Sequence, residues 1–199
     1  MPGQLITKRA FAASLKRLLA DTPLGKLTVT ELARDCGVNR QTFYYHFSDV
    51  YDLVVWTYAN EMDEALGPLR TYATWQDGLL AILAYLAENR SFVMATYRAV
   101  EPVYLRRQLC AYTQELIADV VAEQAAGLNL PPADKALIAR FFAHGFVGLV
   151  LDWIDDGMRE SPQHLVSRLG LVVHGDMGSA IERMSDADRN LPAQTARQR

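Results

Sequence analysis

The chain has 199 residues, of which 50% are hydrophobic and 22% are charged, a balance typical of a globular protein with one or two domains. Its net charge of −3 argues against a uniformly basic nucleic-acid-binding chain, and its two cysteines lack the CxxC spacing of a disulfide scaffold or a zinc site. The N-terminus has no apolar leader-like run, and the longest apolar run, 141–151, is too short to cross a bilayer, so we expect a cytoplasmic protein.

The charge is unevenly distributed along the chain. Residues 1–50 carry seven Lys and Arg residues against four Asp and Glu residues, whereas residues 51–199 carry thirteen against nineteen. A basic N-terminal part on an acidic remainder is the asymmetry expected if only the N-terminal part meets phosphate.

We expect a first helix with Thr7 as its N-cap, running to about Asp21. Its buried face is formed by Phe11, Leu15 and Leu18. The first turn carries Lys8 and Arg9, where the helix dipole disfavours cations. A phosphate against this turn would offset that cost, but two solvated side chains explain the pattern equally well.

The next predicted helix begins with a capping box. Thr28 can accept a hydrogen bond from the amide of Glu31, and the Glu31 carboxylate can reach back. One apolar stripe follows at helical spacing, formed by Val29, Leu32, Ala33 and Cys36. Gly37 ends this helix, because glycine enters a left-handed conformation without steric cost.

Asn39 is a good N-cap for a second short helix, Arg40–Phe47, which buries Phe43 and Phe47. The rest of that helix is polar or amphipathic: Arg40, Gln41, Thr42, Tyr44, Tyr45 and His46. Such a surface on a short helix pair suits the major groove of DNA, so we interpret the stretch as a helix-turn-helix. The alternative is an ordinary helical hairpin whose aromatic side chains all pack inward.

The remaining periodicity predicts only helices. Ser48 or Asp49 caps the first of them, Thr74 with Asp77 caps the second, and Ser161-Pro162 opens the last. The first covers residues 50–66, and the second, which Thr74 and Asp77 cap, ends before a break at 89–91. The later helices cover residues 92–100, 103–126, 133–157 and 162–184. The predicted fold is therefore all-α, with a DNA-binding domain at 1–50, a helical effector-binding and dimerisation domain at 51–185, and a frayed tail at 186–199.

The two long C-terminal helices carry more apolar surface than a monomer needs, which predicts a homodimer. The predicted interface residues are Phe142, Gly145, Leu149, Trp153, Leu165, Leu169, Val172 and Val173. The alternative is that both faces pack on the helix at 103–126. DNA recognition also favours a two-fold symmetric dimer, because such a dimer binds the two half-sites of a palindrome.

The middle helices carry aromatic side chains with polar groups between them, a pattern that suits a small-molecule cavity. The candidate effector residues are Tyr85, Tyr97, Arg98, Tyr104, Tyr112 and His144. Tyrosines in the core with solvated hydroxyls, and a core histidine, explain the same pattern equally well.

No motif assembles a catalytic centre, a metal site or a phosphate loop, so we predict no enzyme activity and no cofactor. The acidic residues Asp152, Asp155, Asp156 and Glu160 fit a solvated helix end better than a metal site, since Trp153 and Ile154 lie between them.

The run LTVTELARDCGVNRQTFYYHFSDVYDLV, residues 27–54, resembles the N-terminal DNA-binding signature of the TetR family of bacterial regulators. The resemblance implies a three-helix head followed by a divergent helical domain that binds a ligand and forms the dimer. It also implies a homodimeric regulator of transcription, and an effector changes the affinity of such a regulator for its DNA operator. It implies phosphate contacts by Thr28, Thr30 and the start of the first helix, and base or backbone contacts by residues 40–46 except Phe43. Arg40 is the best base reader. At Val50 the chain departs from the pattern, which commonly has a phosphate-binding lysine there.

Two runs, FYYHF–D–YDLVVW and W-I-x-x-G-M-x-x-S-P, are similar to regulators associated with dihydroxyacetone kinase operons. Members of that branch can activate transcription and can respond to a protein. The alternative function is therefore a DNA-bound co-activator whose C-terminal domain docks a metabolic protein.

Overall fold

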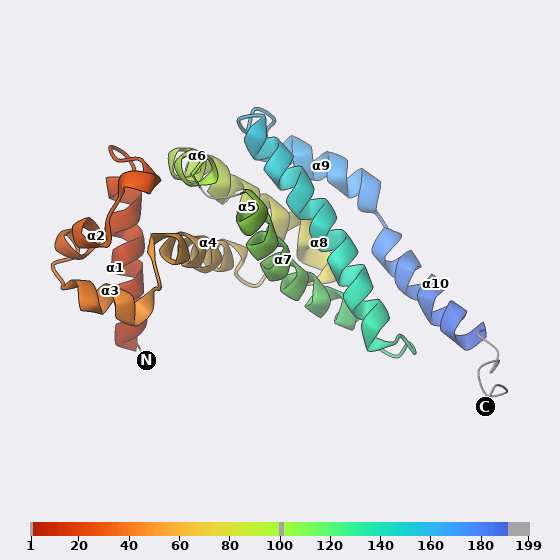
Figure 1. Cartoon of the computed structure of the whole chain (residues 1–199). Coiled ribbons are helices and arrows are strands. Elements are labelled where there is room, and N and C mark those ends of the chain that lie inside the picture. The colour runs from red at the N-terminus through yellow and green to blue at the C-terminus, as the bar shows by residue number, and fades with distance from the viewer. Residues whose placement is uncertain (1, 100–101, 191–199) are drawn as a thin grey trace. The chain divides into compact units, whose positions relative to one another are not determined.

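The computed structural model describes residues 2–99 and 102–190, and within these ranges every regular element is a helix (Figure 1). The α-helices are α1 (Pro2–Leu18), α2 (Val29–Asp35), α3 (Arg40–His46), α4 (Val50–Leu66), α5 (Trp75–Glu88), α6 (Arg90–Tyr97), α7 (Pro102–Gln124), α8 (Pro132–Asp155), α9 (Pro162–Val173) and α10 (Asp176–Asn190). Short 3₁₀ helices cover Leu24–Lys26 and Tyr72–Thr74. The predicted all-α class is confirmed.

The described residues fall into two compact units. Unit 1 holds the chain as far as Ala65 together with Ala84–Gln108, and unit 2 holds Leu66–Leu83 and the described chain from Leu109 onward. Helices α5 and α7 contribute residues to both, as does α4 through its last residue, Leu66. The first unit boundary follows Ala65, so the expected domain boundary near residue 50 stays a prediction.

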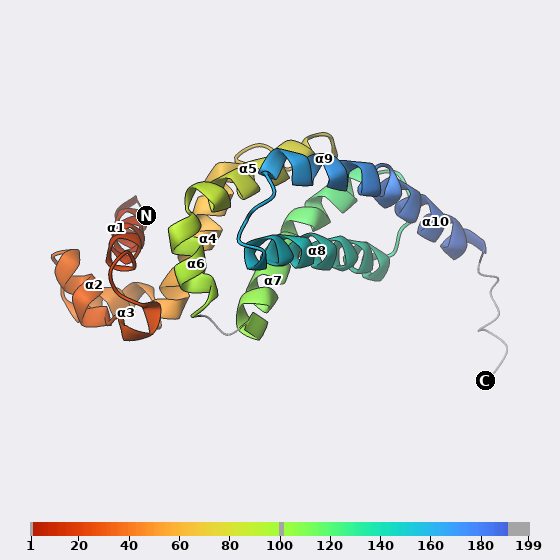
Figure 2. The same cartoon turned by 90° about the horizontal axis from the view of Figure 1, so that it is seen from above.

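Unit 1 is built on an aromatic core in the head, the name used here for α1, α2 and α3. The ring of Phe11 meets those of Phe43 and Phe47 edge-on, with centroids 5.2 and 6.2 Å apart. Leu15 and Leu32 are fully buried beside them. Burial of each such side chain contributes about 1.5–3 kcal/mol, so these few residues account for the packing of three short helices. Farther along unit 1, α6 lies beside α4 (Figure 2), where the rings of Tyr58 and Phe92 are 5.1 Å apart.

Helix α1 begins earlier than the sequence pattern indicated. The Thr7 hydroxyl donates to the carbonyl of Gly3 at 3.0 Å, one turn back within the helix, so Thr7 is not the N-cap. Helix α5 begins at Trp75, directly after the predicted cap Thr74. Thr71 caps the 3₁₀ turn before it, and the Thr71 amide donates to the Thr74 hydroxyl at 3.1 Å.

The predicted continuous helix at 162–184 is wrong, because the chain breaks between α9 and α10. Gly175 has a φ of 75°, in the left-handed region that glycine enters without steric cost. Ser161 does cap α9, accepting from the His164 amide at 3.3 Å. Helix α10 then continues to Asn190, beyond the expected start of fraying, and residues 191–199 lie outside the described residues.

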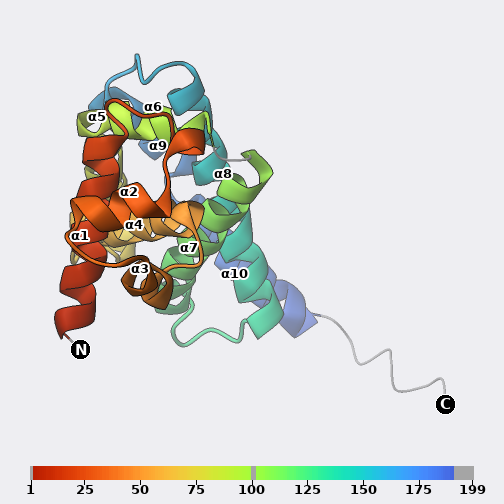
Figure 3. The same ribbon diagram turned by 60° about the vertical axis from the view of Figure 1, so that its left-hand side comes forward.

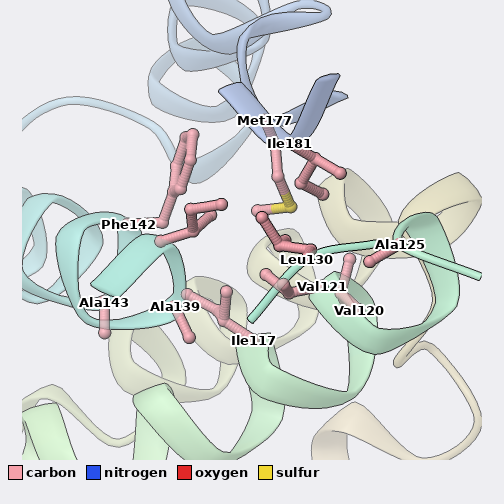
Figure 4. Close-up of a cluster of buried hydrophobic side chains, with 11 residues drawn as sticks. Ile117, Val120, Val121, Ala125, Leu130, Ala139, Phe142, Ala143, Met177 and Ile181 are labelled. Atoms are coloured by element: carbon pink, nitrogen blue, oxygen red, sulfur yellow. The ribbon is translucent and has the colours of Figure 1, made fainter. Parts of the chain in front are cut away.

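The break has a packing consequence in unit 2. It lets α10 direct Met177 and Ile181 into a cluster with side chains of α7, α8 and the segment joining them (Figure 4). The other members of this cluster are Ile117, Val120, Val121, Ala125, Leu130, Ile138, Ala139, Phe142 and Ala143.

Helix α8, which contains the apolar run at 141–151, has 24 residues and is long and apolar enough to cross a membrane. Its most apolar stretch is 44% buried within the chain. The core helix of a globular domain has the same length and composition, and α8 supplies core residues of unit 2.

Candidate DNA-binding surface and ligand cavity

The predicted capping box at the start of α2 is confirmed. The Thr28 hydroxyl accepts from the Glu31 amide at 3.2 Å, while the Glu31 carboxylate accepts from the Thr28 amide at 2.9 Å and from its hydroxyl at 2.7 Å. These bonds to Thr28 lower the pKa of the Glu31 carboxyl below its ordinary value. Gly37, with a φ of 68°, follows α2 and lets the chain turn into α3.

Helix α3 is fixed at both ends. Asn39 accepts from the amide of Thr42 at 2.9 Å and from its hydroxyl at 3.1 Å, so the predicted N-cap is confirmed. Phe43 is fully buried and anchors the helix against Phe11 of α1. The side chains on the opposite face of α3 are therefore held in place by a short, well-packed element.

Helix α3 lies next to α1 and α2 in the head (Figure 3). Its outward face carries the predicted DNA-contacting side chains. Arg40 and Gln41 are exposed, and Tyr44 and Tyr45 are 51% and 72% exposed. The hydroxyl of Tyr45 accepts a hydrogen bond from Gln4 of α1 at 3.0 Å. Sequence reasoning missed Gln4 because it began α1 too late, and an earlier start would have placed residues 3–6 beside α3.

Lys8 lies partly buried beside this face. Its ammonium group lies 5.3 Å from the ring centre of Phe47 and 5.4 Å from that of Trp56. Burial, followed by the positive charge of Lys8, lowers the pKa of His46. The lowered pKa favours the neutral imidazole, which has one nitrogen that donates and one that accepts.

The hydroxyl protons of Thr28 and Thr42 are already used in the two helix caps. Their hydroxyls can donate to a phosphate only if those caps open. Thr30 is exposed at the start of α2. The contacts of all three threonines with DNA stay predictions.

The predicted effector residues are distributed over both units. Tyr85, Tyr97, Arg98 and Tyr104 belong to unit 1, whereas Tyr112 and His144 belong to unit 2. Arg98 and His144 are exposed, so the expectation of a core histidine is wrong, and the His144 ring instead bonds to the carbonyl of Arg140 at 3.0 Å.

Unit 2 contains an apolar cavity of about 100 Å³ that none of those six residues lines. Its walls are Leu66, Leu69, Arg70, Thr71, Trp75, Leu79, Ile82, Thr113, Leu116, Ile117, Val120 and Phe146. Trp75, Leu79 and Ile82 lie at helical spacing on α5, as the residues of a packed core do. The pattern of one helix does not indicate a gap that four segments leave between them.

The predicted interface residues divide into two sets. Phe142, Trp153, Leu165 and Leu169 are buried within the single chain, and the Trp153 indole donates to the Glu160 carbonyl at 2.8 Å. Gly145, Leu149 and Val172 are exposed, and Val173 is half-buried. Two residues outside the predicted set, Phe141 and Leu137, are also exposed, and they line a groove of about 650 Å³ among α8, α9 and α10.

Glu160, which follows the acidic end of α8, is paired within the chain. Glu160 binds the His164 ring at 2.8 Å and the Arg168 guanidinium at 3.2 Å, while Asp152, Asp155 and Asp156 are exposed. Among residues 2–99 and 102–190, no three His, Cys, Asp or Glu side chains are grouped to hold an ion.

A head with two capped short helices, an outward polar and aromatic face, and a separate helical unit defines the class of helix-turn-helix transcriptional regulators. The family described as "Bacterial regulatory proteins, tetR family" matches residues 13–55, and the TetR-type "Transcriptional regulator C-terminal region" matches residues 73–175, more than half of the chain. The chain belongs to the TetR family and is a transcriptional regulator, not an enzyme.

One curated relative is the HTH-type dhaKLM operon transcriptional activator DhaS of Lactococcus lactis subsp. lactis (strain IL1403), with 30% identity over 92 residues, or 46% of this chain. The chain spans about half the length of that relative, 49%.

Two solved structures share the fold. The dihydroxyacetone kinase operon activator DhaS has 22% identity and a TM-score of 0.65, over 90% of this chain and 98% of that one. The TetR family repressor AlkX from Dietzia sp. strain DQ12-45-1b has 17% identity and a TM-score of 0.54, over 89% and 96%.

Proposed function

We propose that the protein is a homodimeric, sequence-specific regulator that binds a DNA operator through α3 and the start of α1. It acts in the cytoplasm, and an effector that binds in unit 2 changes its affinity for the operator. The observation that carries the proposal is the face of α3, where Arg40, Tyr44 and Tyr45 project to solvent from a helix fixed by Asn39 and Phe43. Isolating DNA fragments on the purified protein and sequencing them tests it. A recurrent palindrome supports it, and fragments without any common sequence contradict it.

The side chains suggest separate roles at the DNA. Arg40 presents a planar guanidinium that can bond both acceptors of a guanine edge. Tyr45, held by Gln4, is suited to fixing the register on the backbone. Lys8 has its ammonium group beside two aromatic faces, where it can still reach a phosphate as a point charge.

The dimer is supported by the apolar face that α8 and α9 leave uncovered. Phe141 is 72% exposed, Val172 is 70% exposed and Leu149 is 41% exposed. Monomeric proteins rarely leave neighbouring large apolar side chains in water, so a second copy of the chain is the proposed cover.

The cavity in unit 2 favours a small-molecule effector over a docked protein. Because its walls are almost entirely apolar, the proposed ligand is a compact, uncharged hydrophobic molecule, since burial of a charge without a partner is costly. An apolar cavity of about 150 Å³ binds benzene in another protein, and this cavity is smaller, so the proposed ligand is no larger than benzene.

We expect benzene to raise the melting temperature of the protein. A ligand at 100 times its dissociation constant stabilises the folded state by about 2.7 kcal/mol, which corresponds to roughly 5–10 °C at this chain length. Leu79→Trp, which fills the cavity, should abolish the rise, whereas Val103→Trp, at an exposed position of α7 outside the cavity and the α8–α9–α10 groove, should not. An equal rise in all three proteins would mean that benzene binds outside this cavity.

Val50 should leave each subunit with one fewer phosphate contact than a lysine at the same position would give. It is the first residue of α4, and the preceding Asp49 caps the helix by accepting from the Asp52 amide at 2.9 Å. Val50→Lys adds one cation per subunit, so a dimer should gain two phosphate contacts and a salt dependence steeper by about 1.8 log units per log unit of salt. Salt titrations of both proteins on one duplex measure this, and an unchanged slope in a folded variant means that residue 50 does not face the backbone.

A further inference from the structure

A half-buried lysine of α1 joins three other parts of unit 1. The side chain of Lys16 is 25% exposed, and its ammonium group forms an ion pair with Glu61 of α4. It also donates to the side-chain oxygen of Asn89, between α5 and α6, at 2.9 Å. The rings of Tyr85 and Phe92 lie 5.5 and 5.2 Å from the same nitrogen.

The groups around Lys16 are themselves held in place. The side-chain amide nitrogen of Asn89 donates to the backbone carbonyl of Tyr85 at 2.8 Å. This bond fixes the side-chain oxygen of Asn89, which accepts from Lys16. On the other side, the hydroxyls of Tyr58 and Thr96 bond α4 to α6 at 2.5 Å. Burial, and next the neighbouring Glu61, raise the pKa of Tyr85, so its ring faces the cation as a neutral phenol.

A second ion pair joins the same two helices but differs in environment. Arg9 of α1 pairs with Glu64 of α4, and their side chains are 54% and 53% exposed. Solvent screens such a pair, so it contributes little. The Lys16–Glu61 pair is shielded, and removal of one partner leaves the other charge poorly solvated.

We infer that Lys16 is a positioning residue that fixes the head relative to α4 and α6, and thereby sets the distance between operator half-sites that the protein accepts. A movement of α1 also moves the recognition helix α3, because Phe11 of α1 contacts Phe43 of α3. The inference rests on the proposed function, since half-site spacing has meaning only for a dimer with two heads.

The physical consequence is geometric. One added base pair moves a half-site by about 3.4 Å along the duplex and also rotates it about the axis. A head clamped by Lys16 must leave its preferred orientation to follow that displacement, which costs free energy. A head without the clamp can follow it more easily, while the bases that Arg40 meets remain the same.

The test measures binding of the full-length dimer to a series of palindromes whose central spacing changes by one base pair at a time. For the native protein we expect a sharp optimum. In Lys16→Met the affinity ratio between the best spacing and a spacing shifted by one base pair should fall by about tenfold, which corresponds to about 1.4 kcal/mol. Lys16→Arg should retain the ratio, and Arg9→Met, which breaks the exposed pair, should also retain it.

An equal loss at every spacing in Lys16→Met, with the ratio preserved, overturns the inference and leaves Lys16 a purely structural role. If Lys16→Met does not fold, Glu61→Gln replaces it, because the variant keeps the side-chain shape and removes the charge. An unchanged ratio in that variant overturns the inference equally. Failure of the native protein to bind any palindrome as a dimer contradicts the proposed function instead, before any variant is compared.

Discussion

Replacing Phe141 with glutamate should convert the dimer to monomers while the chain stays folded. Phe141 is 72% exposed and makes an edge-on contact with Phe142, so the single chain loses little when its ring is removed. In the proposed interface, each copy would bury a charge against the apolar groove of the other, and buried unpaired charges strongly oppose association. A monomer reads one half-site at a time, so operator affinity should fall by roughly 10²–10⁴-fold.

Sedimentation at micromolar concentration measures the oligomeric state, and a binding titration on the operator measures the affinity. Val103→Glu is the matched control, because Val103 of α7 is also 72% exposed and lies outside the α8–α9–α10 groove. It should leave both the dimer and the affinity unchanged. A Phe141→Glu variant that remains dimeric would show that the exposed face of α8 is not the interface.

The local structure of the head could be predicted because its signals lie within a few residues of one another. Thr28 and Glu31 form their capping box over three residues, Gly37 adopts the left-handed turn, and Asn39 caps α3. Phe43 and Phe47 were identified as buried from their spacing, and both are. Each of these features depends on short-range chemistry that a sequence displays directly.

The predictions that were wrong concern features that depend on how far a helix extends or on packing against distant segments. Thr7 has the chemistry of an N-cap, but α1 extends past it to Pro2. The apolar periodicity of residues 162–184 continues through Gly175, and only the packing of Met177 and Ile181 on α7 and α8 shows why the chain breaks there.

The candidate sites differ in the same way. The exposed face of α3 follows from one helix, so residues 40–46 could be named from the sequence. The cavity in unit 2 arises where α5, α7, α8 and the segment before α5 fail to fill the space among them, and no single periodicity reports such a gap. Trp153 was assigned to a dimer interface from its helical register, but its indole bonds to Glu160 within the same chain.

The last prediction separates base reading from phosphate binding at the operator. Arg40→Ala should weaken binding to the cognate site by about 1–3 kcal/mol and relax the preference at one base pair per half-site, because the guanidinium fork is lost. Arg40→Lys keeps the charge but not the fork, so it should lose most of the same preference with little change in salt dependence. Lys8→Gln should weaken all sequences alike and lower the salt slope, since a phosphate carries no sequence information. Binding titrations on the cognate duplex, single-base variants and random DNA distinguish these results. If Arg40→Ala and Lys8→Gln show the same sequence-independent loss, Arg40 meets the backbone, and the base-reading side chains must be sought among Gln41, Tyr44 and Tyr45 instead.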